Sequence, residues 1–102
     1  MDISFLIEEV EKVSQGYADR LGITRDPDWF VLKLQEELGE LVQSYLMMSG
    51  RARKKNKTED DMRSDFQKEL ADVFCHTLLL AKYYNVDLEK QIKDKWLVWL
   101  KE

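Results

Sequence analysis

Two short stretches, KLQEELGELVQ at residues 33–43 and QKELADVF at residues 67–74, decide how this chain folds. In each of them apolar residues recur at intervals of three or four, which is the spacing of an amphipathic helix. The acidic residues that border these apolar faces are Glu36, Glu37, Glu40, Glu69 and Asp72. At about 100° per residue, each acidic set occupies one arc of its helix. We therefore expect two helices that pack together and bring five carboxylates close to one another.

The same periodicity continues through the rest of the chain and predicts four helices. Asp2 is a suitable N-cap for the first, Pro27 suits the first turn of the second, and Asp87 opens the fourth. The third helix is expected to start near residue 60 or 61, and Asn85 can serve as its C-cap. The predicted helices cover about residues 2–22, 27–49, 60–84 and 87–100, with one long polar connection at residues 51–60.

No stretch alternates in the manner of a β-strand, so we predict an all-α fold with a single domain over residues 1–102. The apolar face of residues 66–84 is too wide for one copy of so short a chain to cover. We therefore expect four-helix protomers that assemble into a helical-bundle homo-oligomer, either a dimer or a tetramer. Trp96 and Trp99 are expected in the core or in a subunit interface.

Composition excludes several classes of function. The formal charge of −4 argues against binding to a nucleic acid polymer. A single cysteine, Cys75, cannot form an intramolecular disulfide or a cysteine-based zinc site, and its apolar surroundings predict a buried structural thiol. No apolar stretch is long enough to span a membrane, and the acidic start MDISFLIEEVEK is unlike a signal peptide. We expect a cytoplasmic protein that does not bind a membrane.

Five clustered carboxylates would repel one another unless they take up protons or hold a cation. Ligation by carboxylate oxygens alone suits Mg²⁺, with Mn²⁺ as a substitute. The alternative is a solvated acidic face, which is common on helices of an acidic chain. Two positions speak against it, because Glu40 borders the apolar arc of its helix and Glu69 stands among apolar neighbours.

The pattern EExxE at residues 36–40, followed by ExxD at residues 69–72, resembles the MazG-type nucleotide pyrophosphohydrolases of the all-α NTP pyrophosphatase superfamily. The resemblance covers roughly residues 29–96, including VDLEK at residues 86–90. It implies a Mg²⁺-dependent house-cleaning hydrolase that cuts nucleoside triphosphates between the α and β phosphates and works as a homo-oligomer. The metal ligands that it implies are Glu37, Glu40, Glu69 and Asp72. Glu36 would assist them or orient a water molecule.

Three further residues are candidates for substrate binding. Trp29 and Lys33 share the stripe of Glu36, so Trp29 could stack on a base and Lys33 could contact phosphate. The alternatives are a core anchor for Trp29 and a salt bridge from Lys33 to Glu37. Lys95 is the third candidate. The family often has Asn and Arg beyond this position, whereas here Lys95 is followed by WLVWLKE, so phosphate contacts from this end rest on Lys95 alone.

Two other features have alternative interpretations. His76 lies one turn after Asp72, where it is either a partner of the metal ligands or a core histidine. The basic run at residues 51–57 either closes over a triphosphate or is a solvated loop.

Two functions from other classes compete with the hydrolase. One is a non-catalytic helical oligomer that binds a nucleotide or a metal and has a regulatory role. The other is a carboxylate-bridged di-iron bundle, which is disfavoured because the only histidine is not three residues from a glutamate. No GxxxxGK[ST] loop is present to cradle β and γ phosphates. The nucleoside triphosphate is therefore expected to be attacked by water at its α phosphorus and to release pyrophosphate.

Overall fold

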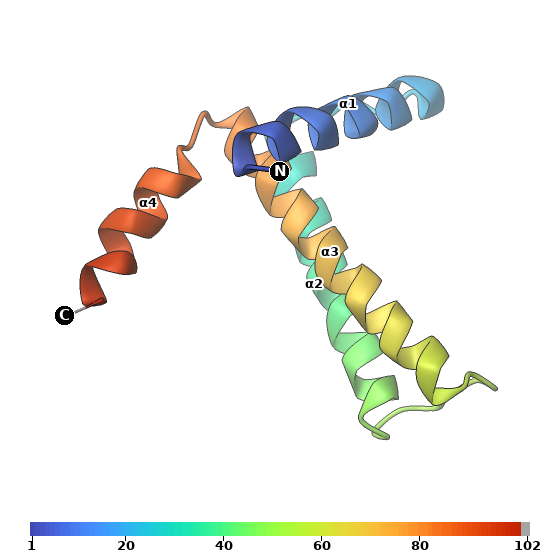
Figure 1. Ribbon diagram of the computed structural model, residues 1–102. Helices are drawn as coiled ribbons and strands as arrows, with labels where there is room; N and C mark the ends of the chain where they lie inside the picture. The colour runs from blue at the N-terminus through green and yellow to red at the C-terminus, as the bar shows by residue number, and fades with distance from the viewer. Residues whose placement is uncertain (101–102) are drawn as a thin grey trace.

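The computed structural model describes residues 1–100, which form four α-helices and one short 3₁₀ helix (Figure 1). The elements are α1 (Ile3–Leu21), α2 (Pro27–Met48), α3 (Glu59–Tyr83), α4 (Leu88–Lys95) and η1 (Leu97–Trp99). No strand occurs within these residues, which confirms the predicted all-α class. None of the described helices is both long and apolar enough to cross a membrane.

Each α-helix begins at a side chain that caps its free N–H groups. The four N-cap residues are Asp2, Asp26, Thr58 and Asp87. The starts predicted at Asp2, Pro27 and Asp87 are confirmed. Helix α3 starts slightly earlier than predicted, because Thr58 accepts from the Asp61 N–H at 3.1 Å and the Asp61 carboxylate accepts from the Thr58 N–H.

The C-terminal helix is shorter than the sequence predicted. A helix was expected to continue to about Leu100, but α4 ends at Lys95 and the 3₁₀ helix η1 follows. The residues after Lys95 are WLVW, and aromatic and β-branched side chains lose rotamer freedom in an α-helix. Helix α4 does not pack along α1, α2 or α3, so tertiary packing does not offset this preference.

Helices α2 and α3 form a long antiparallel hairpin, and α1 crosses the end of it where α2 begins and α3 ends (Figure 1). The interior is small. Its fully buried apolar side chains are Ala18, Phe30, Met62, Leu78, Leu79 and Ala81. Most of them lie where the three helices meet. This junction therefore sets the positions of α1, α2 and α3 around the carboxylates.

The protomer is extended for its length. Its radius of gyration is 16.3 Å, whereas a compact domain of 100 residues has about 13 Å. Helix α4 points away from the hairpin (Figure 1). Trp96 and Trp99 are 69% and 73% exposed, so the prediction that they lie in a core is wrong for a single protomer. Their placement in a subunit interface stays a prediction.

Candidate metal centre

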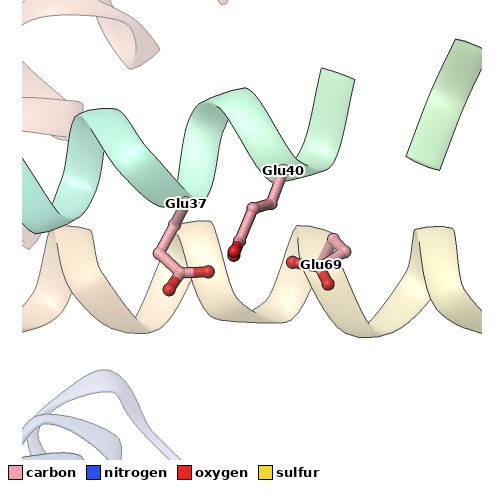
Figure 2. Close-up of side chains that lie close together, drawn as sticks. All are labelled: Glu37, Glu40 and Glu69. Carbon is pink, nitrogen blue, oxygen red and sulfur yellow. The ribbon is translucent and has the colours of Figure 1, made fainter. Parts of the chain in front are cut away.

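Three of the five predicted carboxylates converge between α2 and α3 (Figure 2). Glu37 and Glu40 project from α2, and Glu69 meets them from α3. One carboxylate oxygen from each residue lies within 4.8 Å of the others. The hairpin places them together because Glu37 and Glu40 are three residues apart and share the face of α2 that packs on α3. These three residues are called the carboxylate cluster below.

Burial and repulsion from neighbouring carboxylates raise the pKa values of Glu37 and Glu69. Burial contributes most at Glu37, followed by hydrogen bonding with Glu40 and repulsion from Glu40 and Asp72, and together they raise its pKa to about 7 against the opposing effect of Lys33. Burial likewise raises the pKa of Glu69, assisted by repulsion from Asp72 and Glu40. The cluster is therefore an arrangement that favours a proton or a cation.

Two oxygen atoms of the cluster have no hydrogen-bond donor. Glu37 Oε2 and Glu69 Oε2 are both buried and unpartnered. A buried acceptor that lacks a donor is costly, and a carboxylate oxygen in this state is the preferred ligand of a hard divalent cation. The donor set consists only of carboxylate oxygens, which suits Mg²⁺ or Mn²⁺. The residues present thus fit a divalent cation held by Glu37, Glu40 and Glu69.

The two remaining carboxylates lie beside the cluster. Asp72 is close enough to raise the pKa values of Glu37 and Glu69, and it lines the adjoining cavity. Glu36 is exposed, and its carboxylate lies 3.4 Å from Lys33 Nζ. The predicted convergence of five carboxylates is thus realised by three of them. Lys33 does form a salt bridge, but with Glu36 three residues along instead of with Glu37.

A cavity of about 530 Å³ adjoins the cluster between α1, α2 and α3. The predicted residues Trp29, Lys33, Glu37 and Asp72 line one side of it. Helix α1 provides the other side, including Tyr17 and Arg20. Sequence reasoning missed these two residues, because nothing in the helical pattern of α1 indicates which part of the chain it will cover. The cavity combines aromatic, cationic and acidic side chains beside the carboxylates.

His76 lies at the boundary between the cluster and the cavity. Its Nε2 atom is 3.9 Å from Glu37 Oε1, and its buried Nδ1 atom has no hydrogen-bond partner. Burial and the nearby Lys33 lower its pKa against the opposing effect of Asp72, Glu36 and Glu40, which favours the neutral imidazole. His76 therefore lies next to Glu37 without a hydrogen bond to it, and its role as a partner of the metal ligands stays a prediction.

Arg25, in the connection between α1 and α2, was not predicted to matter. Its guanidinium donates to both carboxylate oxygens of Glu11 at 2.7 and 2.9 Å, and to Ser14 Oγ at 3.1 Å. The same group lies 6.0 Å from the centre of the Trp29 ring. Glu11 is 14 residues away along the chain, so no local pattern could reveal the pair. Arg25 fixes α1 and Trp29 relative to each other and thereby shapes the cavity.

Two predicted phosphate-binding elements lie away from the cluster within one protomer. Lys95 is at the end of α4, which extends away from the hairpin (Figure 1). The basic run at residues 51–57 lies at the far end of the hairpin from α1 (Figure 1). Within that run Lys57 pairs with Asp65 at 2.5 Å and Arg51 donates to the Tyr45 hydroxyl at 3.1 Å. These contacts agree with a solvated loop.

Comparisons of this chain with protein families, with curated proteins and with solved structures gave no match.

Proposed function

We propose that this protein is a divalent-cation-dependent nucleoside triphosphate pyrophosphohydrolase of the MazG type, which releases a nucleoside monophosphate and pyrophosphate. One observation carries the proposal. Two helices bring three carboxylates together beside a cavity of about 530 Å³ that also contains aromatic and cationic side chains. The order of the EExxE and ExxD motifs along the chain adds the resemblance to that family.

The unpartnered oxygens of Glu37 and Glu69 support a cation site. Glu37, Glu40 and Glu69 would hold Mg²⁺, and Asp72 would join them from the cavity side. Bound there, Mg²⁺ supplies charge neutralisation on phosphate oxygens and activation of water. The negative charge of the carboxylate cluster would attract the cation. Lys33 adds positive charge at the edge of the cavity, and its ammonium group pairs with Glu36 there.

The cavity supports a nucleotide as the substrate. Trp29 and Tyr17 offer aromatic faces on which a base can stack, and a stacked base contributes binding energy whatever its identity. Arg20 and Lys33 offer positive charge to phosphates. A base in this cavity would place the phosphate nearest to the sugar beside the carboxylates. Water would then attack the α phosphorus, the bond to the bridging oxygen would break, and pyrophosphate would leave.

The proposal includes assembly of several identical protomers. The accessible surface of one protomer is 7995 Å², whereas a compact protein of this mass exposes about 6,000 Å². The excess of roughly 2,000 Å² is what each partner contributes to an obligate dimer interface. We propose a homo-oligomer, a dimer or a tetramer, as the working form.

Hydrolysis in ¹⁸O-labelled water tests the reaction. A panel of ribo- and deoxyribonucleoside triphosphates is incubated with the protein and Mg²⁺. The products are separated, and their masses are measured by mass spectrometry. Attack at the α phosphorus places the label in the monophosphate and leaves pyrophosphate unlabelled. Label in pyrophosphate, or orthophosphate as the first product, would contradict the mechanism.

The same panel distinguishes the enzyme from the regulatory binding protein. Calorimetric binding of a triphosphate with no turnover, at any Mg²⁺ or Mn²⁺ concentration, would favour the non-catalytic alternative. Glu59→Gln provides the matched control, because Glu59 is an exposed acid at the start of α3 and far from the cluster along that helix. This variant should retain the activity of the wild type.

A further inference from the structure

The last described part of the chain, residues 87–100, forms an arm with no covering partner. It consists of the N-cap Asp87, helix α4, η1 and Leu100, and it extends away from the hairpin (Figure 1). Its exposed large apolar side chains are Ile92, Trp96, Leu97, Val98, Trp99 and Leu100. Two tryptophans exposed by more than two thirds on one short segment are unusual for a surface that faces only water.

A second uncovered apolar surface lies on the hairpin. It is formed by Leu38, Val42 and Tyr45 of α2 together with Leu70 and Phe74 of α3, each between 42% and 50% exposed. On α2 these residues lie about 110° round the helix from the side that packs on α3, and on α3 they lie about 110° round from the side that packs on α2. Because the helices run antiparallel, rotations in the same sense put both sets on one side of the hairpin. We call it the hairpin face.

The hairpin face lies on the opposite side from α1 and the cavity. Asp72, which lines the cavity, lies on the other side of α3 from Phe74 by the same rotation. Along α3 the hairpin face is hollowed into a shallow groove between Leu70, Val73 and Phe74. A partner that packs there would leave the mouth of the candidate site free.

The turn that precedes the arm directs it outward. Asn85 has a left-handed backbone with φ of 54°, and its N–H donates to the Lys82 carbonyl at 3.1 Å. The N–H of Val86 donates to the Ala81 carbonyl at 2.8 Å. The C-cap of α3 is Tyr84 and not Asn85 as predicted, because Asn85 takes the left-handed position one residue further on. This hydrogen-bonded turn fixes the direction in which the chain leaves α3. The arm is therefore held away from the hairpin of its own protomer.

Charge distinguishes a protein partner from a membrane surface. Amphipathic segments that lie on anionic lipid carry an excess of lysine or arginine. In the arm, Lys90, Lys93 and Lys95 are balanced by Asp87, Glu89 and Asp94, and Lys90 is already paired with Asp94 at 2.6 Å. The arm therefore has no excess of positive charge, and its exposed apolar side chains match those of the hairpin face, where Arg51 lies over the Tyr45 ring at 5.8 Å.

We propose that the arm of each protomer packs across the hairpin face of a second copy of this chain, so that two copies exchange arms. The arm and the hairpin face are two uncovered apolar surfaces of the described residues, and joining them removes both from water. The excess surface of roughly 2,000 Å² per protomer is enough for an obligate dimer interface. The proposal concerns assembly and stands whether or not the protein hydrolyses nucleotides.

Disulfide trapping in the full chain tests the exchange directly. Cys75, the single cysteine, is first changed to Ser. Trp96→Cys is then placed in one copy and Phe74→Cys in another copy that carries a larger tag, and the mixture is oxidised. We expect a disulfide-linked pair with one copy of each size. Absence of this pair would overturn the proposal.

A chain that carries both cysteines shows which copy receives the arm. Arm exchange predicts covalent dimers, of about twice 12.2 kDa, on a non-reducing gel. A disulfide closed within one chain, which leaves a monomer, would mean that the arm folds back on its own hairpin and would also overturn the proposal.

Charged substitutions on the arm test independently whether the arm contributes to dimer affinity. Trp96→Glu with Trp99→Glu should raise the dimer dissociation constant at least tenfold in sedimentation equilibrium. Leu32→Glu is the matched control, because Leu32 is 65% exposed on α2 but lies about 110° round from the hairpin face. Far-UV circular dichroism should show the same helix content in both. An unchanged dissociation constant in the arm variant would contradict arm exchange.

Vesicles test the membrane alternative. The wild-type protein is mixed with vesicles of phosphatidylcholine and phosphatidylserine and sedimented. We expect the protein to remain in the supernatant. Sedimentation with the vesicles that is lost in the Trp96→Glu, Trp99→Glu variant would show that the arm binds lipid instead of a second copy.

Discussion

Glu37 is the residue at which a proton and a cation would compete if the cluster binds a metal. Its side chain is 12% exposed, its Oε2 atom has no donor, and burial together with Glu40 and Asp72 raises its pKa to about 7. Near neutral pH, a cation that binds the cluster therefore displaces a proton. The same carboxyl group would be charged throughout the neutral range if it stood on an open helix face.

The raised pKa of Glu37 predicts how pH acts on the metal-free protein. Between the ordinary carboxyl value of 4.5 and about 7, the folded chain binds more protons than the unfolded chain. The stability that this proton contributes is complete at low pH and is lost as pH rises through 7. In EDTA, the Tm of the wild type relative to Glu37→Gln should therefore fall between pH 5 and pH 8.

The comparison with Glu37→Gln isolates this effect from His76. Burial lowers the pKa of His76, so its contribution to stability has the opposite sign and is lost as pH falls. Because the two groups are neighbours, Glu59→Gln serves as a second reference and should follow the wild type at every pH. If the Tm of the wild type instead rose relative to that of Glu37→Gln as pH increases, the raised pKa of Glu37 would be contradicted.

Removal of single carboxylates should separate activity from stability. Glu40→Gln and Asp72→Asn each take a negative charge away from Glu37 and Glu69, which relieves repulsion in the metal-free cluster. We expect turnover to fall by several orders of magnitude, while Tm in EDTA stays equal or rises. Activity is measured by pyrophosphate release over a Mg²⁺ titration. Near wild-type activity of both variants at ordinary Mg²⁺ would show that these carboxylates are not the metal ligands.

At the scale of elements, α1 depends on one buried connection. The Arg25 side chain is only 10% exposed and its guanidinium joins the end of the α1–α2 connection to Glu11 in the middle of α1. A fork of two parallel hydrogen bonds to one carboxylate is a geometry that lysine cannot reproduce. The position of α1, and with it the Tyr17 side of the cavity, rests on this pair.

Arg25→Lys should therefore destabilise the protein although it keeps the charge. Hydrogen bonds that involve a charged group contribute about 1.5–3 kcal/mol, and we expect a loss of about 2 kcal/mol in the free energy of unfolding by urea. A double-mutant cycle with Glu11→Gln should show coupling between the two residues. Arg53→Lys, on the exposed loop, should change the free energy by less than about 0.5 kcal/mol. Equal effects of the two lysine substitutions would rule out a special role for Arg25.

At the scale of the whole molecule, one protomer buries too little apolar surface. Among residues 1–100, six apolar side chains are buried, whereas apolar residues on all four α-helices stay exposed. A small domain is marginally stable even when it is compact. Here the apolar surface that a compact fold would bury stays exposed, and we propose that another protomer covers it.

Folding and assembly should accordingly be linked. Sedimentation at micromolar concentration should show no folded monomer, and the Tm should rise with protein concentration because association stabilises the folded state by mass action. A monodisperse, helical species of 12.2 kDa with a concentration-independent Tm would defeat this prediction.

The sequence by itself determined the elements of this protein. Apolar periodicity, the caps at Asp2 and Asp87, and Pro27 in a first turn locate three helix starts and the all-α class, because these signals act within a few residues of chain. It also identified Glu37, Glu40 and Glu69, since their places on the helix border follow from local spacing. The C-terminal helix was predicted too long, because its aromatic residues have no neighbour in the protomer to pack on.

Only the tertiary structure decided how these elements share space. Helical spacing alone cannot separate Glu36 from Glu37, and it is the packing of α2 on α3 that buries one carboxylate and leaves the other paired with Lys33. The cavity wall from α1 and the Arg25–Glu11 pair likewise join residues far apart in the chain. Long-range packing sets burial, and burial sets both the unpartnered oxygens and the raised pKa of Glu37. Chemistry at this site therefore depends on contacts that no local pattern records.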